Sequence, residues 1–225
     1  MTNLIHRIRY IGFLMILTFL AAIPATAKGG DGETTDRAAR IVFTETLLSN
    51  LGYWITNVDA KSDDSTRQAI IAFQKVNGLK RTGVLDDKFM TALVAAGRPA
   101  AKHGGPAHVE IDISRQVIFL VDDSGGVTHV LSTSTGNGER YLSEGKWQTA
   151  VTPRGVFKVT RQIKGSRKAP LGTIYYPSYF NGGIAIHGSN SIPVKAASHG
   201  CARIPRFAEK QMSDLVKVGM TVYVY

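Results

Sequence analysis

The hydrophobic pattern of this chain changes part-way along its length, and that change limits the folds that are open to it. Residues 36–98 carry apolar side chains at steps of three and four, which is typical of amphipathic helices. From residue 107 onward, apolar and polar side chains alternate, as they do in half-buried strands. The strands are too irregularly spaced for a parallel α/β sheet. The predicted fold class is two domains, a small all-α N-terminal module of three helices and a mainly β domain with one short helix.

Three helices are expected in the N-terminal module, residues 36–98. The first ends close to Gly52 and carries its apolar residues near one face: Ile41, Leu47, Leu48 and Leu51. The second begins at candidate N-caps in Asp63-Asp64-Ser65, ends at Asn77-Gly78, and carries Ala69, Ile70, Phe73 and Val76. The third begins at Asp86-Asp87 and continues to Gly97. Residues 28–35 are Gly-rich and polar and predict a flexible lead-in, whereas residues 99–107 predict a linker.

The strands of the second domain, residues 108–225, are placed by the same reasoning. Val109, Ile111 and Ile113 alternate with polar residues, and residues 117–121 form a continuous apolar run. The sequence Asp122-Asp-Ser-Gly-Gly126 predicts a hairpin turn into a strand at residues 127–135. Further strands are expected at residues 155–163, 184–187 and 220–225, with one helix at about residues 207–218.

Residues 1–27 have the three parts of a secretory signal peptide. His6, Arg7 and Arg9 precede an apolar stretch at residues 11–23, and small residues follow at Ala25-Thr26-Ala27. The apolar stretch is short for a membrane span, which needs about 20 residues. An uncleaved N-terminal anchor is the alternative. In both cases we expect export to the periplasm or to the outer face of the cytoplasmic membrane or cell wall, with no transmembrane segment after residue 27.

The composition narrows the possible partners. The 225 residues include 27 Lys and Arg against 17 Asp and Glu, a net charge of +10, and a single cysteine. One cysteine excludes an intrachain disulfide and a four-cysteine metal site. Removal of residues 1–27 leaves a charge of +8, and most of the excess lies on residues 108–225. An exported chain without a nucleic-acid motif is not expected to bind nucleic acid.

One stretch of the second domain contains basic residues without any acid. Its members are Arg154, Lys158, Arg161, Lys164, Arg167 and Lys168. They form either a solvated face of the domain or a surface that attracts anionic wall polymer and stem carboxylates through screened, long-range electrostatics.

Cys201 is the strongest candidate for chemistry. A thiol attacks as the thiolate and therefore needs an imidazole or a cation nearby. His187 ends a predicted strand and is the candidate base, and Gly188 leaves room for a close approach to its ring. Gly200 allows backbone N–H groups to turn inward and form an oxyanion hole. Arg203 is placed either to bind a substrate carboxylate or to lower the thiol pKa.

Other interpretations of the same residues remain open. A lone cysteine in an apolar stretch is often a buried, inert side chain. A zinc site would use His187, His199 and Cys201, but His199 and Cys201 are awkwardly close for chelation and a fourth ligand is not evident. A serine-based triad is disfavoured because the G-x-S-x-G sequence is absent.

The second domain resembles the catalytic domain of the L,D-transpeptidases. That family shows His-Gly, a gap of a dozen or so residues, and then Ser/Thr-His-Gly-Cys. The counterparts here are His187-Gly188 and Ser198-His199-Gly200-Cys201. Residues 150–157 also resemble the family's T-P-x-G-x-F strand, and residues 174–187 resemble its approach to the histidine.

The resemblance implies a role for each of these residues. Cys201 would be the nucleophile, and His187 the general base and acid, oriented by the carbonyl of Gly188. The N–H groups of Gly200 and Cys201 would hold the oxyanion, while Ser198 and His199 support the site. Family members carry either Asn or Arg two residues after the cysteine, so a substrate-binding role is open to Arg203.

The first domain resembles the small peptidoglycan-binding domain found beside many cell-wall enzymes. That family shows an L-G-Y stretch, an A-V-x-x-F-Q-x-x-x-G-L helix and an x-G-x-x-D turn. The counterparts here are Leu51-Gly-Tyr53, residues 69–79 and residues 82–86. The family motif does not fix the residues that touch glycan, so none is carried over.

Together the two resemblances imply a peptidoglycan L,D-transpeptidase. Its cysteine would release D-alanine from a tetrapeptide stem, keep the stem as a thioester, and pass it to an acceptor amine on a second stem. No metal or organic cofactor is implied, the partners are stem peptides and glycan, and we expect a monomer. The alternatives are an L,D-carboxypeptidase, in which water takes the acyl group, and a non-catalytic wall-binding protein.

Overall fold

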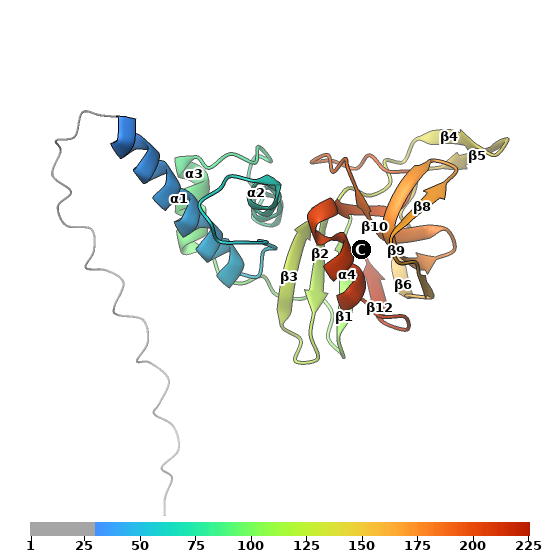
Figure 1. Cartoon of the computed structure of the whole chain (residues 1–225). Coiled ribbons are helices and arrows are strands. Elements are labelled where there is room, and N and C mark those ends of the chain that lie inside the picture. Colours follow the sequence, from blue (N-terminus) through green and yellow to red (C-terminus); the bar gives the residue numbers. More distant parts are fainter. Residues whose placement is uncertain (1–29) are drawn as a thin grey trace, which may run out of the picture. The chain divides into compact units, whose positions relative to one another are not determined.

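The computed structural model describes residues 30–225, so the predicted signal peptide at residues 1–27 lies outside the described part (Figure 1). Residues 37–225 form one compact unit. Within the described residues, no helix combines the length and the apolar character that a membrane span requires. The predicted fold class is confirmed, with three N-terminal helices followed by a mainly β domain that has one short α-helix.

The N-terminal helices are α1 (Gly30–Asn50), α2 (Asp64–Val76) and α3 (Asp87–Ala95). Asp63 caps α2, because its Oδ1 accepts a hydrogen bond from the Thr66 N–H at 2.9 Å, and Asp86 caps α3 in the same way. Helix α1 begins within the segment predicted to be a flexible lead-in, so residues 30–35 are helical instead. Once a helix is nucleated, each added residue gains a hydrogen bond, and polar residues without proline continue it.

The first sheet has the strand order β3-β2-β1-β12-β6. Its strands are β1 (His108–Asp112), β2 (Val117–Val121), β3 (Val127–Ser132), β6 (Gly155–Lys158) and β12 (Thr221–Val224). Strands β1 and β12 are parallel, and the other neighbours are antiparallel. The predicted turn at residues 122–126 joins β2 to β3 (Figure 1).

The second sheet has the order β11-β10-β9-β7, with β8 also paired to β9. Its strands are β7 (Arg161–Gln162), β8 (Ser166–Ala169), β9 (Gly172–Asn181), β10 (Ile184–Ser189) and β11 (Ala202–Pro205). A separate hairpin is formed by β4 (Arg140–Ser143) and β5 (Lys146–Thr149). A 3-10 turn (Arg206–Ala208) leads into α4 (Glu209–Leu215), which packs on β9.

The strand predicted at residues 155–163 is wrong in one respect, because the chain changes sheets within it. The Val159 N–H bonds to Met220 O in the first sheet, whereas the Thr160 N–H bonds to Tyr179 O in the second. The segment therefore forms the two short strands β6 and β7. Strands β4, β5, β8, β9 and β11 were not predicted. Strand β9 is the longest of the described strands, but Pro177 interrupts its alternation.

Strand β2 is buried on both of its faces. Val117, Phe119 and Val121 belong to a core that includes Phe73 and other residues of the helical module. Ile118 and Leu120 belong to a second core shared with the second sheet and α4. Burial on both faces favours apolar side chains at every position of a strand, which accounts for the continuous apolar run at residues 117–121. The helical module and the β domain therefore share a core.

The predicted linker at residues 99–107 is tied to the first sheet. The Lys102 and His103 N–H groups donate to the carboxylate of Glu110 at 3.0 and 2.6 Å, and the Tyr225 hydroxyl donates to it at 3.0 Å. Glu110 is fully buried on β1. Its carboxylate is thus paired by the linker and by the chain terminus.

The shared core predicts that the helices and sheets unfold together. Phe73 is fully buried on α2, with its ring edge-on to Tyr53 and Phe89 at centroid distances of 5.4 and 5.2 Å. We expect Phe73→Ala to lower the free energy of unfolding by about 3–5 kcal/mol, because it leaves a cavity in that core. Urea unfolding followed by circular dichroism and by tryptophan fluorescence should show one shared transition at lower urea.

Val94→Ala on α3 is the matched control, because Val94 is 65% exposed. It should change the free energy of unfolding by no more than about 0.5 kcal/mol. Two separate transitions, of which only one moves in Phe73→Ala, would contradict a shared core.

Candidate active site

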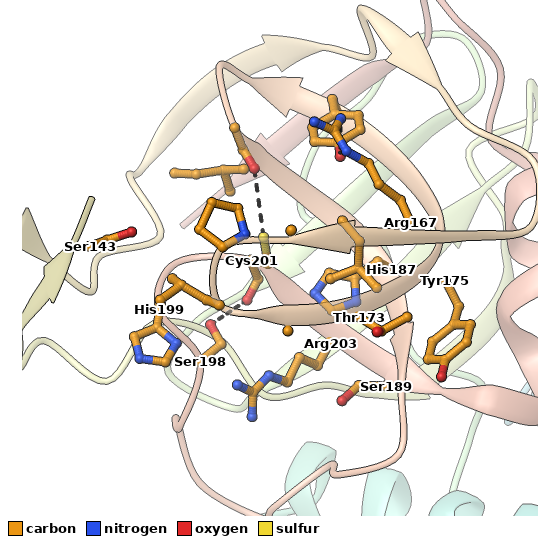
Figure 2. A pocket seen from close by; sticks show the side chains of 18 of the residues that line it. Ser143, Arg167, Thr173, Tyr175, His187, Ser189, Ser198, His199, Cys201 and Arg203 are labelled. Carbon is orange, nitrogen blue, oxygen red and sulfur yellow. Dashed lines mark hydrogen bonds between the residues drawn. The ribbon is translucent and has the colours of Figure 1, made fainter.

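Five of the predicted site residues line one pocket of about 770 Å³, whereas Gly188 and Gly200 do not line it (Figure 2). His187 comes from β10 and Arg203 from β11, Cys201 directly precedes β11, and Ser198 and His199 come from the loop before it. The pocket is completed by residues of the β4–β5 hairpin and of β7, β8 and β9.

The parallel pairing of β10 with β11 brings the nucleophile and base candidates together. In this pairing His187 lies opposite Arg203, and Ile186 lies opposite Ala202. Paired residues of neighbouring strands point to the same face, so Arg203 shares the face of His187, and Cys201, directly before the strand, lines the same pocket. The ladder therefore converts a sequence separation of a dozen or so residues into a single chemical site.

His187 is held in a defined orientation. Its ring is buried, with 5% exposure for the residue, and its Nδ1 lies 2.8 Å from the carbonyl oxygen of Gly188. A carbonyl oxygen only accepts, so Nδ1 carries the proton and Nε2 keeps its lone pair. Burial, joined by the charge of Arg203, lowers the His187 pKa below its usual value, while the Gly188 carbonyl opposes this. At neutral pH the imidazole is therefore a neutral base.

Gly188 has a structural reason that the sequence did not suggest. A Cβ at this position would collide with the side chain of Glu209 at the start of α4. Glycine is thus required here for packing against α4.

Cys201 is half-buried, and its Sγ accepts a hydrogen bond from the Ala185 N–H at 3.4 Å. Desolvation of the sulfur raises its pKa above the usual thiol value. The Ala185 N–H and the positive charge of Arg203 lower it, but burial outweighs both. Arg203 therefore acts in the predicted direction without producing a resting thiolate. Among the described contacts, no hydrogen bond joins His187 to Cys201, so the resting pair is a neutral thiol and a neutral imidazole.

The loop before Cys201 is closed by Ser198. The Ser198 hydroxyl donates to the carbonyl of Cys201 and accepts from the Gly200 N–H at 3.0 Å. Gly200 has a φ of +136°, and its carbonyl accepts from the Thr152 hydroxyl at 2.6 Å. The Gly200 N–H is therefore already bonded in this conformation, which differs from its predicted role as an oxyanion donor. Glycine is needed there because a Cβ would lie 2.9 Å from the Val151 oxygen.

His199 is exposed on the other side of the pocket from His187 (Figure 2). Its ring packs edge-on against Tyr141 of the β4–β5 hairpin at a centroid distance of 4.6 Å. Across residues 30–225, no three His, Cys, Asp or Glu side chains come together in a way that could hold a metal ion. The zinc arrangement of His187, His199 and Cys201 is therefore not formed in the described part of the chain.

Comparison with known proteins places this chain in a family. A sequence model of the L,D-transpeptidase catalytic domain (YkuD) matches residues 106–224, more than half of the chain. The chain belongs to the L,D-transpeptidase catalytic domain family. A second family model, described as a putative peptidoglycan binding domain, matches residues 37–93.

Solved structures of L,D-transpeptidases are similar to this family member. One from Xylanimonas cellulosilytica is 39% identical, with a TM-score of 0.79 over 82% of this chain and 92% of that chain. One from Stackebrandtia nassauensis is 20% identical, with a TM-score of 0.48 over 83% of this chain and 89% of that chain. No curated protein matches this chain.

The pocket of this L,D-transpeptidase family member contains two arginines that were predicted only as part of the basic run. The Arg161 guanidinium lies over the Tyr179 ring, 4.2 Å from its centroid, and Arg167 donates to the Tyr179 hydroxyl at 3.1 Å. With Arg203 they make three arginines around the pocket, and no described acidic residue lines it. The acid-free run at residues 154–168 was the sequence signal for this arrangement.

Alkylation of Cys201 by iodoacetamide should report a thiol pKa above that of an ordinary cysteine. The thiolate is the reacting form, and burial disfavours it. Arg203→Gln should move the midpoint of the rate-against-pH curve further upward, because it removes a positive charge that stabilises the thiolate. Arg206→Gln is the control, since Arg206 instead pairs with Glu209 and stacks on Tyr175. A wild-type midpoint below that of a free thiol would contradict the predicted direction.

Proposed function

We propose that this chain is a cysteine-dependent acyltransferase that acts on the tetrapeptide stems of peptidoglycan and joins one stem to another. The observation that carries the proposal is the β10–β11 pairing, which brings Cys201, His187 and Arg203 to a single pocket. Membership of the L,D-transpeptidase catalytic domain family supports the same reaction class.

The first half of the reaction releases D-alanine. Cys201 Sγ attacks the carbonyl carbon between the L-centre of the diamino acid and the terminal D-alanine, while His187 Nε2 takes the thiol proton. The tetrahedral intermediate collapses, the C–N bond breaks, and His187 returns the proton to the leaving amine of D-alanine. The stem remains bound to Cys201 as a thioester.

The second half transfers the stem to an acceptor. The amine of a second stem attacks the thioester carbon and gives a proton to His187, which then reprotonates the departing Cys201 sulfur. One amide bond is broken and one is formed, so no oxidant or energy source is required. The Cys201 N–H is the predicted oxyanion donor that remains, because the Gly200 N–H is bonded to Ser198.

A neutral Cys201 thiol and a neutral His187 imidazole in the resting enzyme are consistent with these two reaction steps. Burial raises the pKa of Cys201 and lowers that of His187, so the proton moves from sulfur to imidazole during the attack itself. His187 acts as a general base within the step, and the enzyme does not store a thiolate that solvent electrophiles would consume.

The arginines of the pocket favour an anionic substrate. A stem peptide carries several carboxylates, and Arg161, Arg167 and Arg203 surround the pocket without a lining acid. Guanidinium groups bind carboxylates by paired hydrogen bonds. We assign Arg203 to a stem carboxylate beside the reacting carbonyl, and Arg161 and Arg167 to carboxylates further along the stem.

The partner and location follow from the two domains. The peptidoglycan-binding domain match at residues 37–93 indicates peptidoglycan as the partner, and both domains belong to an extracytoplasmic, wall-acting protein. Residues 1–27 are proposed to direct export to that compartment.

Cys201→Ala should abolish D-alanine release from a synthetic tetrapeptide stem, and His187→Gln should slow it roughly 100-fold or more. His129→Gln, which alters a β3 histidine outside the pocket, should retain activity. Mass spectrometry of the products separates the alternatives: cross-linked dimers indicate transpeptidation, and tripeptide alone indicates the carboxypeptidase. Unchanged activity in Cys201→Ala, or no acyl adduct on Cys201 with a carbapenem, would contradict a cysteine nucleophile. A wild-type protein that releases no D-alanine would leave the wall-binding alternative.

Replacing Arg161 and Arg167 together by Gln should raise KM for the stem roughly tenfold with a smaller change in kcat, because charge-assisted bonds to substrate carboxylates are lost. The increase should shrink as salt screens the interaction. Arg154→Gln, an exposed member of the same basic run outside the pocket, is the control. Equal KM values for the double variant and the wild type would refute this assignment.

A further inference from the structure

Lys75 of α2 is buried between the helical module and the first sheet, with 2% of the residue exposed. Its Nζ donates to three oxygens, Gln116 O at 3.0 Å, Ser132 Oγ at 2.8 Å and Thr133 O at 2.9 Å. An ammonium group has three N–H donors, so every donor has an acceptor. Within residues 30–225, no carboxylate forms an ion pair with it.

Burying a lysine at this position costs more free energy than burying an apolar side chain of similar size. Desolvation by burial, joined by the nearby charge of Arg81, lowers the pKa of Lys75 to about 7. An apolar side chain would pack at the same place without burying a charge. Lysine adds directional contacts, because its three hydrogen bonds fix the positions of residues 116, 132 and 133 relative to α2.

The segment that Lys75 holds, residues 132–135, is bonded on its other side to the loop of Cys201. The Thr133 hydroxyl donates to Arg203 O at 2.7 Å, and the Ser134 hydroxyl donates to Lys195 O at 2.8 Å. The Thr135 carbonyl accepts from the N–H groups of Ala197 and Ser198 at 3.0 and 2.9 Å. All four residues of the segment are at most 1% exposed.

Gln116 reinforces the same segment. Its side chain accepts from the Thr135 N–H at 2.8 Å and donates to the Thr135 hydroxyl at 2.6 Å. Gln116 has a φ of +62°, which is uncommon for a residue other than glycine. Its carbonyl, presented by this conformation, accepts from both Lys75 and the Thr133 N–H.

Arg81 provides a second and direct connection. It follows α2 in the chain, and its guanidinium donates to Val194 O at 2.9 Å and to Ser114 O at 3.4 Å. Val194 belongs to the loop between His187 and Cys201. Two basic side chains of the helical module are therefore connected to the backbone around Cys201. Lys75 is connected through residues 132–135, and Arg81 bonds directly to Val194.

We propose that the helical module is a working part of the active site, and that Lys75 and Arg81 are positioning residues that hold the Cys201 loop in register with His187. The inference rests on the proposed function for its activity readout. Losing either contact lets residues 194–203 shift relative to β10, and small misplacements of a nucleophile are costly to the chemical step.

The test compares Lys75→Met and Arg81→Gln with two matched controls. Phe73→Leu alters the packing of the same helix against Tyr53 and Phe89, and Lys80→Gln removes an exposed cation next to Arg81. We expect Lys75→Met and Arg81→Gln each to lower kcat for D-alanine release roughly tenfold with KM within about twofold. Phe73→Leu should lower Tm but leave kcat unchanged, and Lys80→Gln should change neither.

The rate of iodoacetamide alkylation of Cys201 gives a readout that does not depend on the reaction. It should differ from wild type by threefold or more, at one pH, in Lys75→Met and Arg81→Gln, and not in the controls. If the wild type releases no D-alanine but the two variants still show altered alkylation, the proposed function is wrong and the positioning role of Lys75 and Arg81 stands. If Lys75→Met does not fold, Arg81→Gln alone tests the positioning role. Arg81 is only half-buried, so its replacement should leave the fold intact. Wild-type kcat and alkylation in Arg81→Gln, or an equal loss of kcat in Phe73→Leu, overturn the positioning role.

Discussion

The architecture depends on one strand, β2, that is covered on both faces. One face packs against the helical module and the other packs against the second sheet and α4. Removing either layer would expose a row of large apolar side chains to water, at a cost of about 25 cal/mol per Å². The helices and the sheets are therefore bound into one unit, and the site on β10 and β11 is built on a support that includes the peptidoglycan-binding-like module.

The site itself follows from strand pairing and loop closure. The β10–β11 ladder brings a histidine and a cysteine to one pocket, and the Ser198 hydrogen bonds close the loop before the cysteine. Burial then sets the chemistry, because it disfavours charge on both the thiol and the imidazole. Three arginines and no described acidic residue line the same pocket, so its charge favours an anionic ligand. The orientation of the two side chains, their protonation and the positive charge around them thus come from one pocket.

Hydrogen bonds from polar side chains fix the orientation of the packed layers, which apolar contacts alone do not specify. Apolar contacts between α2 and the first sheet hold the module in place, but they are non-directional. Lys75, Gln116 and Arg81 add hydrogen bonds with defined partners, and these partners lead to the loop of Cys201. The module that matches the peptidoglycan-binding family is in this way joined by hydrogen bonds to the pocket that holds Cys201 and His187.

The sequence alone determined the fold class, the three helices with their Asp63 and Asp86 caps, and the cluster of His187, Ser198, Gly200 and Cys201, because periodicity, capping and local motifs are written in neighbouring residues. It did not determine the sheet change at Val159, the long strand β9 or the helical start of α1. Only the tertiary structure decided that the two domains share a core, that burial keeps the thiol and imidazole neutral, that the Gly200 N–H is already bonded, and that Arg161 and Arg167 enter the pocket. Each of these depends on residues far apart in the chain, whose contacts exist only after the layers have packed.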